Sequence, residues 1–232
     1  MLELERARKY YASTGETIHA VDEVSMSVAA GEFVAIFGPS GSGKTTLLLL
    51  AAGLLRTDSG SVRFEGRDLA ALSRAEALAY RRTKLGFVFQ DFNLAAGLTA
   101  EENAALPLLL GGARHREAHE RALRALEDVG LARRRTHTPD RLSGGEQQRL
   151  AIARALVGEP KLILADEPTG NLDSATGNAV LELLSALPRE HGAAVVLVSH
   201  DARAARVADR VLGMRDGRLA EPDLEAQAAI GR

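Results

Sequence analysis

Four runs of apolar residues, each followed by polar residues, stand out along the chain. They occupy residues 33–37, 85–89, 162–165 and 195–198. Unbroken apolar runs of this length are typical of strands that are buried on both faces. Because helical segments, such as the stretch from about 99 to 130, alternate with them, the pattern predicts a parallel sheet covered by helices on both faces.

Both ends of the chain carry the signals of antiparallel strands. Residues 2–37 predict a series of short strands, and residues 62–67 carry another strand-and-turn signal. Near the other end, the pair Asp216-Gly217 interrupts an apolar segment, which is typical of a β-hairpin. We therefore expect a small antiparallel sheet beside the parallel one.

A glycine-rich motif, G-x-x-x-x-G-K-[ST], joins the first apolar run to a stretch of helix formers. Its residues are Gly38, Pro39, Ser40, Gly41, Ser42, Gly43, Lys44 and Thr45, with Thr46 next in the helix. In such a loop, consecutive backbone N–H groups and the helix dipole converge on one anion. An ordinary glycine-rich turn would explain the glycines, but it would not explain the Lys-Thr pair. We expect a nucleoside triphosphate here, with Lys44 on its β- and γ-phosphates and the Thr45 hydroxyl on Mg²⁺.

Two acidic residues, Asp166 and Glu167, directly follow the apolar run at 162–165. They emerge at the carboxyl edge of the predicted sheet, where ligands gather in α/β folds. Two solvated acids at the end of a strand are common, but the upstream phosphate loop favours a chemical role. We expect Asp166 to hold Mg²⁺ through water and Glu167 to polarise the attacking water.

The segment from Leu142 to Gln148 predicts a second phosphate-binding surface. Ser143 and Glu146 have the spacing of a capping box at the start of a helix. That interpretation leaves Gly144 and Gly145 unexplained, since a glycine inside a helix costs up to about 1 kcal/mol relative to alanine. Bare backbone at a helix N-terminus suits an approaching phosphate. We therefore expect Ser143, Gly144 and Gly145 to contact a nucleotide.

Composition narrows the class of protein. The 232 residues carry a net charge of −2, with 46% hydrophobic and 26% charged residues, as in a soluble globular domain. The charge gives no support to a nucleic-acid partner, and the triplet 133–135 of arginines is read as a solvated loop. Cysteine is absent, which fits a reducing cytosolic location. No secretory pattern or apolar run of roughly 18 residues occurs, so any membrane must be crossed by other chains.

Taken together, these motifs resemble the nucleotide-binding subunit of ATP-binding cassette (ABC) transporters over nearly the whole chain. The resemblance implies an α/β fold with a P-loop NTPase parallel-sheet core, a small antiparallel β subdomain and an inserted α-helical subdomain. It implies one domain over 1–232, with the core at about 1–90 and 140–232 and the helical subdomain at about 91–140. Two copies would enclose two ATP molecules, so that Ser143 of one copy contacts the nucleotide held by Lys44 of the other.

Further site residues follow from the same resemblance. Gln90 matches the Q-loop glutamine near Mg²⁺, Asp173 lies in a segment resembling the D-loop at the dimer seam, and His200 resembles the switch histidine on the γ-phosphate. Alone, such a histidine is more often a structural residue. An aromatic residue stacks on adenine, and because strand neighbours face opposite ways, only one of Tyr10 and Tyr11 can do so. The spacing favours Tyr11.

Within the family, residues 91–94, 98–103 and 106–109 resemble the ATPases of lipoprotein-releasing, macrolide-exporting and cell-division permeases. Phe92, Leu94 and Leu98 fit either a groove for a permease helix or ordinary core. We expect ATP hydrolysis with Mg²⁺ on the cytoplasmic face of the membrane, with ATP-driven closure of a head-to-tail homodimer powering the permease subunits. A signalling switch without transport, an importer ATPase and a soluble ABC protein of DNA repair or translation are the alternatives.

Overall fold

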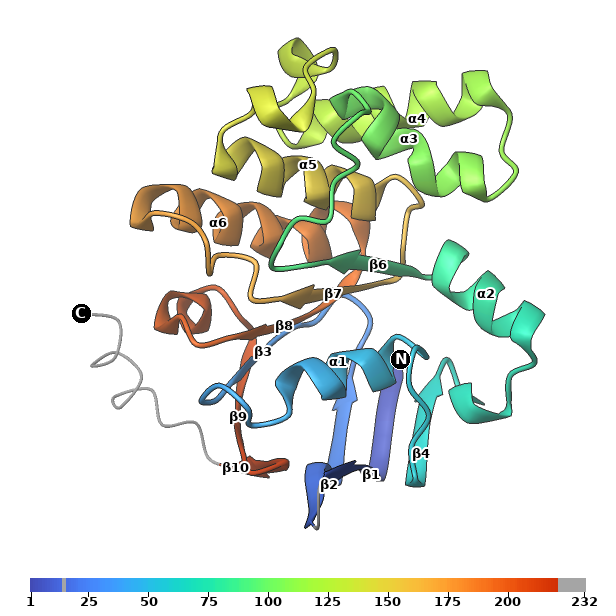
Figure 1. Ribbon diagram of the computed structural model, residues 1–232, viewed down its shortest axis with the longest axis vertical. Helices are drawn as coiled ribbons and strands as arrows, with labels where there is room; N and C mark the ends of the chain where they lie inside the picture. Colours follow the sequence, from blue (N-terminus) through green and yellow to red (C-terminus); the bar gives the residue numbers. More distant parts are fainter. Residues whose placement is uncertain (14–15, 221–232) are drawn as a thin grey trace.

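A mixed six-stranded sheet forms the centre of the protein (Figure 1). The computed structural model describes residues 1–13 and 16–220, so the segment 221–232, to which the sequence assigns no role, lies outside the described residues. The sheet has the order β10-β9-β3-β8-β7-β6, and every neighbouring pair is parallel except β10 with β9. Its strands are β3 (Phe33–Phe37), β6 (Leu85–Val88), β7 (Leu162–Asp166), β8 (Ala194–Ser199), β9 (Arg210–Arg215) and β10 (Arg218–Ala220).

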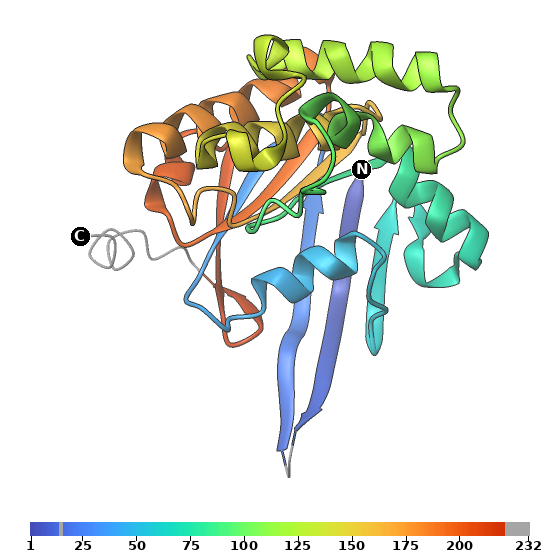
Figure 2. The ribbon, with the colours of Figure 1, turned by 45° about the horizontal axis from the view of Figure 1, so that its top comes forward.

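Helices cover both faces of this sheet, as Figures 1 and 2 show. The helices are α1 (Lys44–Ala51), α2 (Arg74–Thr83), α3 (Ala100–Leu110), α4 (His115–Asp128), α5 (Gly144–Leu156) and α6 (Ser174–His191). Successive residues of β3 face opposite ways: Ala35 belongs to the apolar cluster under α3 to α6, and Ile36 belongs to the cluster around α1. The unbroken apolar runs therefore reflect burial on both faces, and the predicted α/β fold with a parallel-sheet core is confirmed.

A four-stranded antiparallel sheet, in the order β2-β1-β4-β5, packs against the α1 side of the core. Its strands are β1 (Leu2–Ser13), β2 (Glu16–Val28), β4 (Ser59–Phe64) and β5 (Arg67–Asp68). The expectation of short strands over residues 2–37 was wrong, because β1 and β2 are 12 and 13 residues long. Register shifts between Leu4 and Tyr10 interrupt the apolar alternation. In the sequence, a long strand with such register shifts shows the alternation pattern of several short strands.

The expected helical stretch from about 99 to 130 is divided into α3 and α4. Thr99 and Glu102 form a capping box at the start of α3, and Gly111 and Gly112 end it, with Gly112 at a φ of 83°. These helices share one apolar cluster with the central sheet. Short 3₁₀ turns occupy Leu69–Ala71, Ala132–Arg134, Pro139–Arg141 and Ala202–Arg206.

The expected hairpin around Asp216-Gly217 is confirmed. It joins β9 to β10, and its two turn residues have φ angles of 48° and 77°. The backbone N–H of Gly217 donates to Ser42 in the glycine-rich loop, and the N–H of Asp22 donates to Gly217. The hairpin thus ties the last strands of the chain to the loop after β3.

Candidate functional site

The glycine-rich loop lies between β3 and α1, as its sequence predicts. A Cβ at Gly38 would lie 2.1 Å from the carbonyl oxygen of Met214, and one at Gly43 would lie 1.9 Å from that of Ala20. These two glycines are required because other backbone segments approach them closely. Gly41 has open space around it but a φ of 79°, which favours glycine for conformational reasons.

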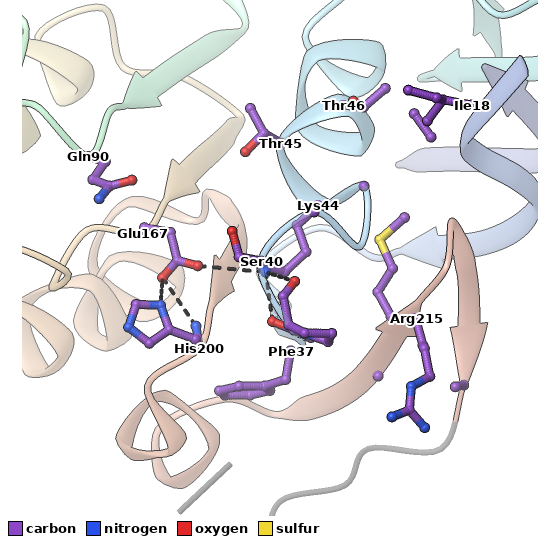
Figure 3. Close-up of a pocket in the computed structure, with 18 of the residues that line it drawn as sticks. Ile18, Phe37, Ser40, Lys44, Thr45, Thr46, Gln90, Glu167, His200 and Arg215 are labelled. Atoms are coloured by element: carbon purple, nitrogen blue, oxygen red, sulfur yellow. Dashed lines mark hydrogen bonds and ion pairs between the residues drawn. The ribbon is translucent and has the colours of Figure 1, made fainter. Parts of the chain in front are cut away.

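Lys44 begins α1, and its ammonium group is held inside the loop. The side chain is buried, and Nζ donates to the carbonyl oxygens of Gly38 at 2.7 Å and Pro39 at 3.0 Å. Nζ also lies 3.7 Å from Oε1 of Glu167 (Figure 3). Burial lowers the pKa of Lys44, while the carboxylates of Glu167 and Asp166 act in the opposite direction. The loop therefore presents a positive charge that is poorly solvated.

Thr45 and Asp166 bring two oxygen ligands together across the loop. The Thr45 hydroxyl lies 3.2 Å from Oδ1 of Asp166. Burial raises the pKa of Asp166; the Thr45 hydroxyl opposes this shift, and the charge of Glu167 adds to it. Within residues 1–13 and 16–220, no three His, Cys, Asp or Glu side chains gather as a metal site. The pair nevertheless fits Mg²⁺ that arrives with a nucleotide, since Mg²⁺ takes one or two protein ligands together with phosphate oxygens and water.

Glu167 follows β7 in a left-handed conformation, with a φ of 45°. A non-glycine residue in this region costs about 1–3 kcal/mol. Because neighbouring residues of an extended strand point to opposite faces, the departure from β geometry allows Glu167 and Asp166 to serve the same site. The Glu167 carboxylate accepts hydrogen bonds from the backbone N–H of His200 at 3.1 Å and faces its Nδ1 at 2.8 Å (Figure 3). It stands between His200 and Lys44.

These groups line one pocket of about 800 Å³. The predicted site residues in its lining are Tyr11, Gly38, Pro39, Ser40, Gly41, Gly43, Lys44, Thr45, Thr46, Gln90, Glu167 and His200. Ser42 is buried, and its hydroxyl has no hydrogen-bond partner within the described residues. Asp166 reaches the site through Thr45. The pocket thus combines a phosphate-sized loop with an acidic group, a histidine and an aromatic ring.

Other residues of the lining escaped the sequence argument. They are Ile18, Ala20, Phe37, Gly213, Met214, Arg215 and Ala220. Ile18 pairs with Tyr11 across β1 and β2, and Met214 and Arg215 reach the pocket because β9 pairs with β3. No local motif marks these positions. Pairing between strands that are far apart in the sequence brings them to the site.

The two neighbouring tyrosines face different surroundings. Tyr11 lines the pocket and is 39% exposed, with Nζ of Lys9 lying 5.8 Å from the ring centroid. The ring of Tyr10 packs on His19 with centroids 4.5 Å apart. Tyr11 is therefore the tyrosine whose ring is available to a nucleotide base in this pocket.

The segment from Ser143 to Gly145 does not line the pocket within the described chain. Ser143 caps α5: its backbone N–H donates to Glu146 at 2.9 Å, and its hydroxyl accepts from the N–H of Glu146 at 3.3 Å. Asp173 also stands outside the lining, where its carboxylate caps α6. Three predicted phosphate contacts and the predicted seam residue are thus absent from the pocket that contains Lys44.

Gly145 has a packing reason that the sequence argument missed. A Cβ there would lie 2.1 Å from Cγ2 of Thr176, which Asp173 holds through a 2.6 Å hydrogen bond to the hydroxyl. At Gly144, a Cβ would meet only Leu172, at an ordinary 3.5 Å. The claim that capping leaves both glycines unexplained therefore holds for Gly144 alone, because close packing of α5 on α6 requires Gly145.

We expect Gly145→Ala to reduce the free energy of unfolding by about 1–3 kcal/mol through overpacking. Thr176→Ser removes the obstructing methyl group and keeps the hydroxyl for Asp173, so the double variant should regain most of that loss. Gly144→Ala is the matched control. Urea unfolding of the four proteins measures the effect, and equal destabilisation by both glycine variants would contradict the packing argument.

Gln90 follows β6 and lines the pocket. Its carbonyl oxygen accepts from Nδ2 of Asn171 at 3.3 Å, and the same Nδ2 lies 3.3 Å from Oδ1 of Asp91. Asn171 belongs to the loop between β7 and α6, which also holds Glu167 and Asp173. The loops after β6 and β7 are thus connected at the edge of the site.

Comparisons with known proteins identify similar chains. The model of the family described as ABC transporter matches residues 21–170. The chain is 43% identical over 231 residues to an uncharacterised ABC transporter ATP-binding protein, YknY, of Bacillus subtilis (strain 168), and the match covers all of both chains. It is 44% identical over 234 residues to the macrolide export ATP-binding/permease protein MacB of Rhodopirellula baltica, with all of this chain matching 34% of that protein.

A solved structure resembles the fold closely. It is the dimeric ATP-binding cassette MJ0796 in a post-hydrolysis state bound to ADP and Pi, with a TM-score of 0.86 and 42% identity. The match covers 95% of this chain and 98% of that one.

Proposed function

Because the chain belongs to the ABC transporter family and is an ATPase subunit of a transporter, we propose that it powers an exporter of the lipoprotein-releasing or macrolide type. The similarity to a macrolide export ATP-binding/permease protein supports that subtype, since the match covers this chain completely. We further propose that the partner is an integral-membrane permease and that the ATPase works on the cytoplasmic face of the membrane. Among the described residues, no helix is both long and apolar enough to cross a bilayer.

The observation that supports this mechanism is the separation of the two predicted phosphate-binding surfaces. Lys44 lies in the pocket, whereas Ser143 and Gly144 stand outside it. We propose that two copies pair head to tail, so that Ser143 and Gly144 of the partner subunit meet the γ-phosphate held by Lys44. Asp173 would lie at the seam between the copies. The dimeric assembly of the cassette MJ0796 supports this arrangement.

Hydrolysis then follows from groups already in place. A water attacks the γ-phosphorus in line with the bond to ADP, and Glu167 accepts the proton as that bond breaks to give ADP and phosphate. Lys44 exchanges its loop carbonyls for phosphate oxygens and stabilises their charge. His200, next to Glu167, donates to the γ-phosphate. Thr45, Asp166 and Gln90 would hold Mg²⁺, which would supply further charge neutralisation at the phosphates.

We propose a single ABC ATPase domain with functional subdivisions. The nucleotide-binding core would comprise about 1–90 and 140–232, and the helical subdomain about 91–140, which includes α3 and α4. Tyr11 would stack on adenine from the β subdomain. ATP would favour the closed dimer and hydrolysis would release it, and the difference in affinity between these states can do work on a permease.

A charge placed at Gly144 tests the shared site. Gly144→Glu in a Glu167→Gln background should leave ATP binding to the monomer unchanged, because Gly144 lies outside the pocket. ATP-dependent dimerisation should weaken by at least about tenfold, since the carboxylate would face the partner's γ-phosphate. Leu110→Glu, which adds the same charge at an exposed position, is the control. Sedimentation with and without ATP measures the dimer, and an undiminished dimer would exclude the shared site.

A further inference from the structure

The chain turns sharply after Gln90 through two consecutive left-handed residues. Phe92 and Asn93 have φ angles of 58° and 50°. Neither is glycine, and for a bulky residue such as phenylalanine this conformation is strongly disfavoured. Such a turn persists only where its surroundings hold it.

Arg154 of α5 provides that hold. Its Nη2 donates to the carbonyl oxygen of Phe92 at 2.6 Å, and Nη1 donates to that of Asn93. Burial lowers the pKa of Arg154. Within the described residues, the hydrogen-bond partners of its guanidinium are these two carbonyl oxygens. The planar guanidinium offers a separate nitrogen donor to each of the two adjacent carbonyl groups, whereas a lysine ammonium would have to reach both from a single nitrogen.

The position of Arg154 links two parts of the candidate site. It stands on the same helix as Gly144, which begins α5. On the other side of the turn, Asn171 holds the carbonyl of Gln90. Residues 90–93 are therefore clamped between α5 and the loop that follows β7.

We propose that Arg154 is a positioning residue for ATP hydrolysis: it fixes residues 90–93 to α5, so that Gln90 keeps its place in the pocket and follows any movement of that helix. The inference rests on the proposed function, in which Gln90 and the first turn of α5 both act on a nucleotide. When a nucleotide bound to the partner subunit contacts the first turn of α5 and shifts that helix, the clamp would move Gln90 of the same copy as α5.

Arg154→Lys keeps the charge but replaces the two-nitrogen fork by a single nitrogen on a shorter side chain, and Arg154→Met removes the donors. Both should lower kcat by roughly tenfold while the KM for ATP stays within about twofold, because Arg154 does not line the pocket. Phe92→Gly supplies the rescue, since phenylalanine is the residue poorly suited to this conformation and glycine adopts it without a holding group. In the Arg154→Lys protein it should restore most of the lost kcat, and alone it should leave kcat near the wild-type value.

Gln90→Ala distinguishes the proposed role of Gln90 in hydrolysis from the proposed role of Arg154 in positioning it. If that variant keeps wild-type turnover, the proposed role of Gln90 falls, and the clamp falls with it. If Gln90→Ala slows turnover but the Arg154 variants do not, only the clamp is overturned. A loss of kcat that Phe92→Gly fails to restore would show that Arg154 merely supports the packing of α5. Melting temperatures of all variants identify any that fail to fold, and Arg154→Lys is the milder of the two.

Discussion

Replacing Glu167 by glutamine is expected to lower the turnover of ATP by about 100- to 10,000-fold, the range for loss of a general base. The substitution removes the proton acceptor and keeps the shape of the side chain. Its amide oxygen can still accept the N–H of His200, so the left-handed turn at residue 167 should persist. ATP binding is expected to remain, because Lys44 supplies the main phosphate contact. Steady-state phosphate release measures turnover, and equilibrium titration measures binding.

The same variant should accumulate a nucleotide-bound dimer, because closure without hydrolysis leaves no route for release. Size-exclusion chromatography with ATP and with ADP distinguishes closure from simple association. Glu159→Gln is a matched control, since Glu159 is an exposed carboxylate whose only ion pair among the described residues is with Arg121. Turnover within about twofold of the wild type in Glu167→Gln would remove Glu167 from its assigned role.

Lys44→Ala is expected to weaken ATP binding by about 10- to 100-fold. Hydrogen bonds to charged groups contribute about 1.5–3 kcal/mol, and each 1.4 kcal/mol is a factor of ten in affinity. In the free protein, the ammonium group satisfies the carbonyls of Gly38 and Pro39, so binding must exchange these contacts for phosphate oxygens. Calorimetric titration of both proteins with ATP measures the change.

AMP gives this experiment its internal control. AMP has a base, a ribose and one phosphate, but it lacks the β- and γ-phosphates that Lys44 is expected to bind. Its affinity should therefore change little in Lys44→Ala. An equal loss for AMP and ATP would indicate that the variant distorts the loop, and it would refute the specific role of Lys44.

The fold could be predicted from sequence where neighbouring residues of an element are buried alike, because they then show one recognisable apolar pattern. Residues 33–37 are buried on both faces, so every position is apolar and the strand is plain from sequence. Strand β1 could not be read in this way, because its register shifts disturb the alternation between its two faces. The division between α3 and α4 was not predicted, because helix-forming residues lie on both sides of Gly111 and Gly112.

The residues of the candidate site likewise fall into those that a contiguous motif predicts and those that only tertiary structure brings together. The glycine-rich loop is contiguous, so its pattern carries its own geometry, including the helix that starts at Lys44. Met214 and Arg215 join the pocket only through the pairing of β9 with β3, which no local pattern reveals. The left-handed backbone at Glu167 and the packing of Gly145 on Thr176 are likewise products of tertiary structure. Sequence alone therefore located the residues that line the pocket better than it predicted the packing around them.

The membership of β3 in both apolar clusters has a consequence for how the molecule opens. Neither cluster can come apart without disturbing this one strand, since Ala35 faces one of them and Ile36 the other. Strand β3, which precedes the glycine-rich loop, should therefore be among the last segments to lose protection from hydrogen exchange during local unfolding. The peripheral helices can then move over large distances while the strand that supports the glycine-rich loop keeps its position.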